Sequence, residues 1–430
     1  MQATMTMPIN AKEVAQPATT AEQTTITLSV VIPAYNEEDG IAEIAHRVLA
    51  VKSELAKVGV HDLELIVVDD GSSDRTVEIA RSIEGVTLIQ HEHNKGYGGA
   101  LKTGFNKARG QLIGFMDADG TYPPEYYPQL CVEALNGAEL VIGSRMAGAD
   151  SQMPLTRRVG NFFFANLLSI IGRQRISDSA SGMRVFHKDV LDRIYPLPDG
   201  LNLTPVMSTR AVHERLNMVE VPIPYSERLG RSKLSVVHDG RIFLQSMVWT
   251  ALTYNPVRIL GLIGLAGIGL AGLIMAGLVV TRLSGITALG VWGVAALYTA
   301  LVAAVTGVSL FALGVAFNYI VSIFHKKPMR QGMFKKPVFR TPIHYHFGWL
   351  GILGLIIGIG VGFVSMALGI GEGSIERLWL YLLGSAMLSL VSVQLIVYSI
   401  LLQVLAELGQ REIAIRREMG LEGELGDLRS

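Results

Sequence analysis

The sequence of 430 residues contains one cysteine, Cys131. A single thiol excludes a disulfide within the chain and a cysteine-based zinc site, and it favours a reducing compartment for the soluble part. An excess of either charge is also missing, because 37 basic residues balance 37 acidic ones. With no net positive field, the overall charge gives no indication of a nucleic acid partner.

The first two dozen residues lack a long apolar run. Residues 1–24 are polar and rich in Ala and Thr, without the apolar core and flanking positive charge of a signal peptide. We expect them to form a disordered tail.

Apolar residues are half of the chain and are unevenly distributed. The N-terminal part alternates short apolar runs with polar ones, whereas the rest is mostly apolar, with spans at about 257–280, 290–324, 347–370 and 378–406. Each span exceeds the roughly 20 residues that cross a bilayer. We therefore predict an α/β domain at 25–240, a juxtamembrane segment at 241–256, a four-helix transmembrane domain at 257–408 and a cytoplasmic tail at 409–430.

The basic residues between the spans predict an orientation. The middle loop, 325–346, is rich in Lys and Arg, whereas the other two loops hold only Arg282 and Arg377. By the positive-inside rule, the N-terminal domain, the middle loop and both termini lie in the cytoplasm of a cell-membrane protein.

Two carboxylates, Asp117 and Asp119, follow the apolar run 112–116 and precede Gly120. Residues i and i+2 of an extended chain point to the same side, so both can face the edge where open α/β sheets bind ligands. Paired carboxylates suit Mg2+ or Mn2+ carried on a diphosphate. The alternative is a polar strand exit with solvated acids, which neighbouring strand exits make less favourable.

A second strand, predicted at 63–68, also ends in two acids, Asp69 and Asp70. They either face a ligand or only cap the helix predicted at 76–83. An earlier strand at 28–32 leads into Asn36, which we expect to cap a helix that starts near Glu37. This repeated strand–loop–helix pattern predicts a parallel sheet that binds a nucleotide at its carboxyl edge.

Glycines and cations follow other predicted strands. The segment 94–100 is rich in glycine and precedes a helix expected at 101–108, so its backbone can approach a phosphate or ribose. It lacks the G-K-[ST] ending of a P-loop. Arg145 follows the strand predicted at 140–143 and is suited to meet phosphate. Arg228 and Lys233 lie on a polar loop and suit a diphosphate, or else are solvated surface charges.

The segment 153–171 differs from the other predicted helices. Arg157 and Arg158 lie near its start, and its body is rich in Phe. It is too short and too charged to span a bilayer, so we predict an interfacial amphipathic helix. A core helix with two solvated arginines is the alternative.

Taken in order, these motifs resemble the GT-A domain of inverting family 2 glycosyltransferases. With its four spans, the chain is similar to polyprenyl-phosphate glycosyltransferases of the dolichyl-phosphate mannose synthase and bacterial GtrB type. The resemblance implies an α/β, Rossmann-like GT-A nucleotide-sugar-binding domain, followed by interfacial helices and four transmembrane helices. It rests on Ile32-Pro33-Ala34-Tyr35-Asn36-Glu37, Val68-Asp69-Asp70-Gly71-Ser72, Asn94-Lys95-Gly96 with Gly98 and Ala100, Asp117-Ala118-Asp119, Gly143-Ser144-Arg145, Asp178 with Ser181-Gly182-Met183-Arg184, and Gly230-Arg231-Ser232-Lys233.

The resemblance also implies roles for single residues. Asp119, Arg145 and Asp178 would be catalytic, with Asp178 beside the reacting centre. Asp117 and Asp119 would hold the cation. The acceptor phosphate would meet Arg145 and either Arg157 or Arg158. The nucleotide sugar would be bound by Pro33, Ala34, Tyr35, Glu37, Asp69, Asp70, Lys95, Gly96, Asp117, Ala118, Asp119, Arg228 and Lys233.

Two departures from related sequences refine the expected activity. Gly120-Thr121 stands where many relatives carry Leu-Gln, whose Gln helps to bind the metal. The Q-x-x-R-W motif of processive synthases is absent, which favours the transfer of a single sugar. The segment 201–210 is expected near the acceptor or the sugar.

The expected reaction is inverting transfer from a UDP- or GDP-linked sugar to undecaprenyl or dolichyl phosphate. Its product, a polyprenyl-phosphate-sugar, would serve envelope glycan synthesis or protein glycosylation. A glycerolipid acceptor is the alternative. A flippase is disfavoured because the spans carry no buried acids. A homo-oligomer formed through the membrane helices is a further expectation of the resemblance.

Overall fold

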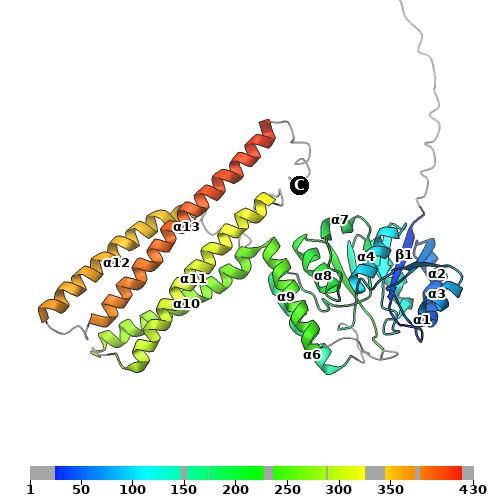
Figure 1. Cartoon of the computed structure of the whole chain (residues 1–430), viewed down its shortest axis with the longest axis horizontal. Coiled ribbons are helices and arrows are strands. Elements are labelled where there is room, and N and C mark those ends of the chain that lie inside the picture. The colour runs from blue at the N-terminus through cyan, green and yellow to red at the C-terminus, as the bar shows by residue number, and fades with distance from the viewer. Residues whose placement is uncertain are drawn as a thin grey trace, which may run out of the picture.

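The computed structural model describes residues 25–146, 153–172, 174–226, 236–286, 289–324, 344–372 and 378–418. An α/β domain and a bundle of long helices lie next to each other (Figure 1). The domain is built on a seven-stranded sheet of order β3-β2-β1-β4-β6-β5-β7. Its strands are β1 (Thr27–Ala34), β2 (Asp62–Asp69), β3 (Val86–Gln90), β4 (Leu112–Phe115), β5 (Leu140–Ser144), β6 (Arg184–His187) and β7 (Met218–Pro222).

Helices cover both faces of this sheet, so its central strands are apolar on both sides. Alternate residues of β1 belong to different cores: Val30 packs in one and Val31 in the other. The first core is completed by α1 (Ile41–Ala50), α2 (Lys52–Lys57), α3 (Thr76–Ser82) and α5 (Tyr127–Leu135), which follows a short 3-10 turn, η1 (Pro124–Tyr126). The second is completed by α4 (Tyr97–Lys107), α7 (Val190–Ile194) and α8 (Leu203–His213).

One strand corrects the prediction of a parallel sheet. β6 runs antiparallel to both of its neighbours, β4 and β5, whereas the other strand pairs are parallel. The chain between β5 and β6 leaves and returns at the same edge and does not cross the sheet. The residues just before β6 therefore lie at the carboxyl edge of β4 and β5, where ligands of open α/β sheets bind.

Two predicted helix starts were wrong. α1 begins at Ile41 and not near Glu37, and Gly40 occupies its N-cap position. Asn36 has a positive φ of 51°, and its side-chain oxygen accepts the N–H of Ser73 at 2.8 Å. Asn36 therefore ties the loop after β1 to the loop after β2. α4 begins at Tyr97, so its first turn includes glycines that we placed in a loop.

α6 (Leu155–Gly172) and α9 (Val236–Tyr254) lie together on one side of the domain (Figure 1). The rings of Phe164 and Phe243 join them, with centroids 6.1 Å apart. Apolar side chains at helical spacing on α6 are exposed, namely Leu155, Val159, Phe162 and Phe163. An apolar surface of this kind suits the membrane interface.

The bundle consists of α10 (Pro256–Leu283), α11 (Val291–Phe324), α12 (His344–Glu372) and α13 (Trp379–Glu418). Within the described residues, four helices are long and apolar enough to cross a membrane, so the chain is a multi-pass membrane protein. A Cβ at Gly264 would lie 2.6 Å from the carbonyl oxygen of Gly307, which shows how small residues allow α10 and α11 to pack closely. The part of the middle loop that carries its basic residues, 325–343, lies outside the described residues.

Candidate active site

A cleft of about 470 Å³ lies at the carboxyl edge of the sheet. Chain segments that follow β1, β2, β4 and β5 line it, together with the loop before β6 and parts of α6 and α9. The structure thus brings together sequence positions from Pro33 to Phe243. The predicted site residues that line the cleft are Pro33, Ala34, Tyr35, Glu37, Asp70, Gly96, Asp117, Ala118, Asp119, Arg145 and Arg157.

Asp117 and Asp119 lie on the turn after β4 and both line the cleft. The hydroxyl of Tyr97 donates to Asp117 Oδ1 at 2.8 Å. Behind this carboxylate lies Gly182, where a Cβ would come within 2.6 Å of Asp117 Oδ2. The Thr121 hydroxyl donates to Asp119 Oδ1 at 2.6 Å. Both carboxylates are therefore oriented by hydroxyl groups, and Thr121 supports Asp119.

This pair of acids fits a cation that arrives with its substrate. In the part of the chain that the structure describes, no group of three or more His, Cys, Asp or Glu side chains is placed to hold a metal. Mg2+ commonly binds one or two carboxylates, and it takes its remaining ligands from substrate phosphates and water. Asp117 and Asp119 match that donor set.

The two acids after β2 have different roles. Asp69 accepts the backbone N–H groups of Gly71 and Ser72, both at 3.2 Å, and does not line the cleft. Asp70 lines the cleft, and its two oxygens accept the N–H groups of Lys95 and Gly96, both at 2.8 Å. Asp69 therefore shapes its own turn, and Asp70 holds the glycine-rich segment against the cleft.

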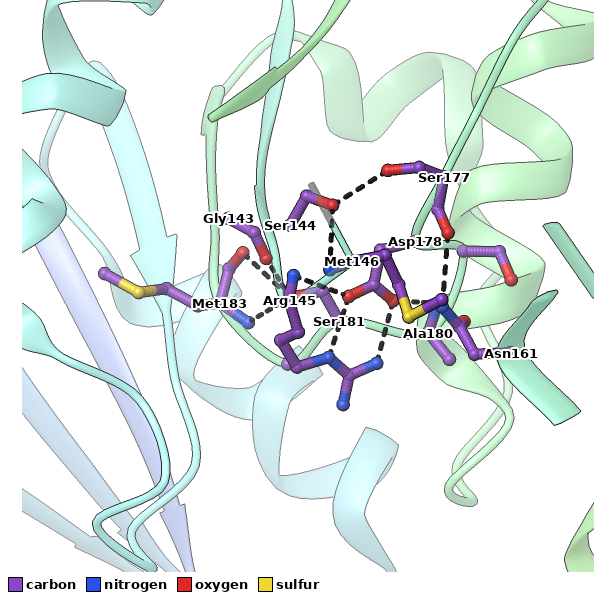
Figure 2. Close-up of polar contacts among 12 residues, drawn as sticks. Gly143, Ser144, Arg145, Met146, Asn161, Ser177, Asp178, Ala180, Ser181 and Met183 are labelled. Atoms are coloured by element: carbon purple, nitrogen blue, oxygen red, sulfur yellow. Dashed lines mark hydrogen bonds and ion pairs between the residues drawn. The ribbon is translucent and has the colours of Figure 1, made fainter. Parts of the chain in front are cut away.

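Arg145 and Asp178 form a buried ion pair (Figure 2). Arg145 Nε and Nη2 donate to the two oxygens of Asp178, each at 2.7 Å, and the backbone N–H of Arg145 donates at 3.0 Å. Burial would raise the pKa of Asp178, but the charge and hydrogen bonds of Arg145 outweigh it and lower this pKa. Asp178 is fully buried and does not line the cleft, whereas Arg145 does.

Two aromatic rings flank the guanidinium of Arg145. Its central carbon lies 5.8 Å from the ring centroid of Tyr122 and 5.4 Å from that of Tyr225. These distances allow cation–π attraction. The hydroxyl of Tyr122 also accepts the N–H of Gly182 at 2.7 Å, so the same ring fixes the loop behind Asp117.

The cleft continues from the acids to α6 and α9. Arg157, Gly160, Asn161 and Phe164 line it from α6, and Gly240 and Phe243 line it from α9. Of the two arginines proposed for the acceptor, only Arg157 lines the cleft; Arg158 is exposed. Leu201 and Thr204, at the start of the segment expected near the sugar or acceptor, also line it.

Several predicted residues are not in the cleft lining. These are Asp69, Lys95, Arg158 and Asp178, while Arg228 and Lys233 lie outside the described residues. Sequence reasoning missed Tyr97, Tyr122, Asn161 and Tyr225, which line the cleft. The only available signal was the position of Tyr97 and Tyr122 within motifs already chosen for their glycines and acids.

Two family models match parts of this chain. A model of "Glycosyl transferase family 2" matches residues 29–195, and a "Domain of unknown function (DUF8752)" matches residues 256–416. A dolichyl-phosphate hexose transferase of Haloferax volcanii is 32% identical over 231 residues, which cover 54% of this chain and 96% of that protein. The low-salt glycan biosynthesis hexosyltransferase Agl6 of the same organism is 34% identical, and the match covers 53% of this chain but only 54% of that protein.

A longer match reaches into the apolar half of the chain. The undecaprenyl-phosphate 4-deoxy-4-formamido-L-arabinose transferase of Klebsiella pneumoniae is 29% identical over 321 residues, covering 73% of this chain and 94% of that protein. Among solved structures, glucosyl-3-phosphoglycerate synthase from Mycobacterium tuberculosis aligns with a TM-score of 0.43 and 22% identity, covering 53% of this chain and 81% of that one.

Proposed function

This chain belongs to the family 2 glycosyltransferases, and we propose that it transfers one sugar from a nucleotide sugar to a membrane polyprenyl phosphate with inversion at C1. The product would be a polyprenyl-phosphate-sugar that donates its sugar to an envelope glycan or to protein glycosylation. One observation carries the proposal. A single cleft contains Asp117 and Asp119 at the sheet edge and continues between α6 and α9, where apolar side chains face outward. The two relatives that match this chain over most of their own length are named as sugar transferases that act with dolichyl phosphate or undecaprenyl phosphate, and these names support the same reaction class.

The donor would lie along the sheet edge. The nucleoside would rest against Pro33, Ala34 and Tyr35, with Asp70 holding the glycine-rich segment beside it. Asp117 and Asp119 would hold Mg2+ or Mn2+ against the diphosphate. When bound, such a cation stabilises the negative charge of the departing nucleoside diphosphate.

The acceptor phosphate would lie between Arg145 and Arg157, which both line the cleft. Its second pKa is near 6, so it is an anion at pH 7 and attacks without a general base. Two cations offset the repulsion between the anionic reactants. Asp178 is buried, and its pKa is lowered, so its role here is to orient Arg145. The donor would be a UDP- or GDP-linked sugar.

The orientation belongs to the same proposal. The basic residues of the loop 325–346 support a cytoplasmic catalytic domain and cytoplasmic termini by the positive-inside rule. A polyprenyl phosphate in the inner leaflet would then reach the cleft through α6 and α9.

The reaction is tested with purified protein, a panel of nucleotide sugars and a short polyprenyl phosphate, with Mg2+ or Mn2+ present. We expect one donor to give a sugar phosphodiester that is labile to mild acid, with inverted configuration by NMR. A glycerolipid acceptor in the same assay tests the alternative. Transfer to that lipid, with none to polyprenyl phosphate, would overturn the proposed acceptor.

A further inference from the structure

Glu220 lies on β7 beside β5, and it does not line the cleft. Its carboxylate nevertheless contacts the turn that leads into the site. Glu220 Oε1 accepts the N–H groups of Ser177 and Asp178, both at 2.9 Å. Glu220 Oε2 accepts the N–H of Ser177 at 3.0 Å and its hydroxyl at 2.8 Å. One carboxylate thus holds the Ser177–Asp178 turn at several points.

These contacts also set the direction of the neighbouring hydrogen bonds. The hydroxyl of Ser177 donates to Glu220, and a hydroxyl has one proton to donate. The oxygen of Ser177 is then left to accept from the hydroxyl of Ser144, which lies 2.8 Å away. Ser144 is the last residue of β5 and directly precedes Arg145. The contact with Glu220 therefore determines which hydroxyl donates in the hydrogen bond between Ser177 and Ser144.

The held turn reaches the cleft by two routes. On one route, Asp178 grips the guanidinium of Arg145 through both carboxylate oxygens (Figure 2). On the other, the carbonyl oxygen of Ser177 accepts from the side-chain amide of Asn161 at 3.2 Å. Asn161 lies on α6 and lines the cleft, as Arg157 does one turn earlier. A shift of the turn would therefore displace both the strand-end cation and the interfacial helix.

We infer that Glu220 is a positioning residue of this active site. It fixes the Ser177–Asp178 turn and, through that turn, the direction in which Arg145 enters the cleft and the position of α6 against it. Glu220 itself touches no reactant. The inference rests on the proposed function only in taking Arg145 to meet a phosphate.

Glu220→Gln tests the inference with little change of shape. The amide turns one accepting oxygen into a donor that faces the N–H and O–H groups of the turn, so hydrogen bonds to the turn are lost and a donor meets other donors. We expect kcat to fall about tenfold, which corresponds to 1.4 kcal/mol. KM for the acceptor phosphate should rise several-fold, and KM for the nucleotide sugar should change less than twofold, because other segments hold the donor.

Glu139→Gln is a matched control. Glu139 also accepts a distant backbone N–H, that of Asn217 at 2.7 Å, and pairs with Arg193. It does not line the cleft. The control should reproduce any general loss of stability while leaving the ratio of the two KM values unchanged.

A double-variant cycle separates positioning from simple stabilisation. In an Arg145→Ala background the oriented guanidinium is gone, so Glu220→Gln should lower the transfer rate by less than threefold. The melting temperatures of the same four proteins form a second cycle that needs no activity. In this second cycle, the decreases in melting temperature of the two single variants should add up to more than the decrease of the double variant.

Each outcome has a distinct meaning. If wild-type protein transfers sugar and both cycles are additive, the inference about Glu220 is wrong and the proposed function stands. If no donor and acceptor react, the proposed function fails, and the melting cycle still decides whether Glu220 and Arg145 are coupled. If Glu220→Gln changed the KM for the acceptor and the KM for the nucleotide sugar by the same factor, as expected for Glu139→Gln, the positioning role would also be overturned.

Discussion

Asp178 holds Arg145 from beneath the cleft: both side-chain hydrogen bonds between them are 2.7 Å long, and only the arginine lines the open space. Asp178 is thereby separated from the cleft, and the guanidinium of Arg145 borders it. We expect the loss of either residue to have a different consequence, because only Arg145 lines the cleft and Asp178 contacts its partner beneath it.

Arg145→Lys should lower transfer by about 10²–10³-fold, the scale seen when one stabilising donor is removed from an active site. Lysine keeps the charge but cannot make the paired hydrogen bonds of a planar guanidinium. Steady-state kinetics with saturating donor measure the loss. Arg47→Lys, at a partly exposed ion pair with Glu125, is the control, and equal losses in the two variants would contradict the assignment.

Asp178→Asn should reduce stability, because it leaves the largely buried charge of Arg145 without its partner, and breaking a buried pair costs about 3–5 kcal/mol. The folded pKa of Asp178 is below its ordinary value of 3.8, so the pair stabilises the fold above that value. This contribution is lost as the pH falls through the lowered folded pKa.

The stability difference between wild type and Asp178→Asn should therefore be constant from about pH 5 to pH 8 and should shrink as the pH falls below about 4. Melting temperature measured across this range checks the sign. Asp178 should contribute no ionisation near neutrality to the pH profile of transfer, so wild type and Asp178→Asn should have profiles of the same shape there. A base with a pKa near 7 at this position would contradict the positioning role.

Asp119→Ala should abolish most transfer and weaken binding of the nucleoside diphosphate in the presence of Mg2+ or Mn2+. Without a cation, the variant and the wild type should bind it about equally, because Asp119 would act through the metal. Calorimetry with and without EDTA measures the difference. Asp62→Asn, at an exposed ion pair with Lys52, is the control. Near-normal turnover of Asp119→Ala would end the metal assignment.

Arg157→Ala and Arg158→Ala form a pair of neighbouring substitutions with unequal expected effects. Arg157 lines the cleft, whereas Arg158 is exposed. We expect Arg157→Ala to raise KM for the acceptor phosphate at least tenfold, and Arg158→Ala to change it less than threefold, the range of a screened surface charge. Kinetics with a short polyprenyl phosphate in detergent provide the comparison. A larger effect at Arg158 would reverse the assignment.

Gly182→Ala should lower activity strongly, since its methyl group would lie 2.6 Å from Asp117 Oδ2 and push that carboxylate from its place. A contact this short forces something to shift. Gly269→Ala on α10 meets nothing within 4 Å and serves as the control. Loss of cation-dependent nucleotide binding in Gly182→Ala alone is the expected pattern; unchanged binding would show that Asp117 tolerates displacement.

Particular residues show how far sequence reasoning reached. Asp117 and Asp119 were found because two acids after a buried run are a local pattern, and both line the cleft. The sequence does not show whether Asp69 or Asp70 lines the cleft. That depends on which carboxylate accepts the N–H groups of Lys95 and Gly96, about 25 residues later. The sequence around Glu220 did not indicate its role, because an acid on an edge strand that holds a turn cannot be distinguished by sequence from an acid that is only solvated.

The sequence by itself determined the apolar spans, the order of strands and helices, and the acids and glycines at the strand exits, since each is set by neighbours within a few residues. Only the tertiary structure decided which of these groups meet. Because β6 enters the sheet antiparallel between β4 and β5, the loop that carries Asp178 and Gly182 returns to the carboxyl edge. That reversal joins Asp178 to Arg145 and Gly182 to Asp117 across dozens of residues, and such contacts depend on the path of the chain through space.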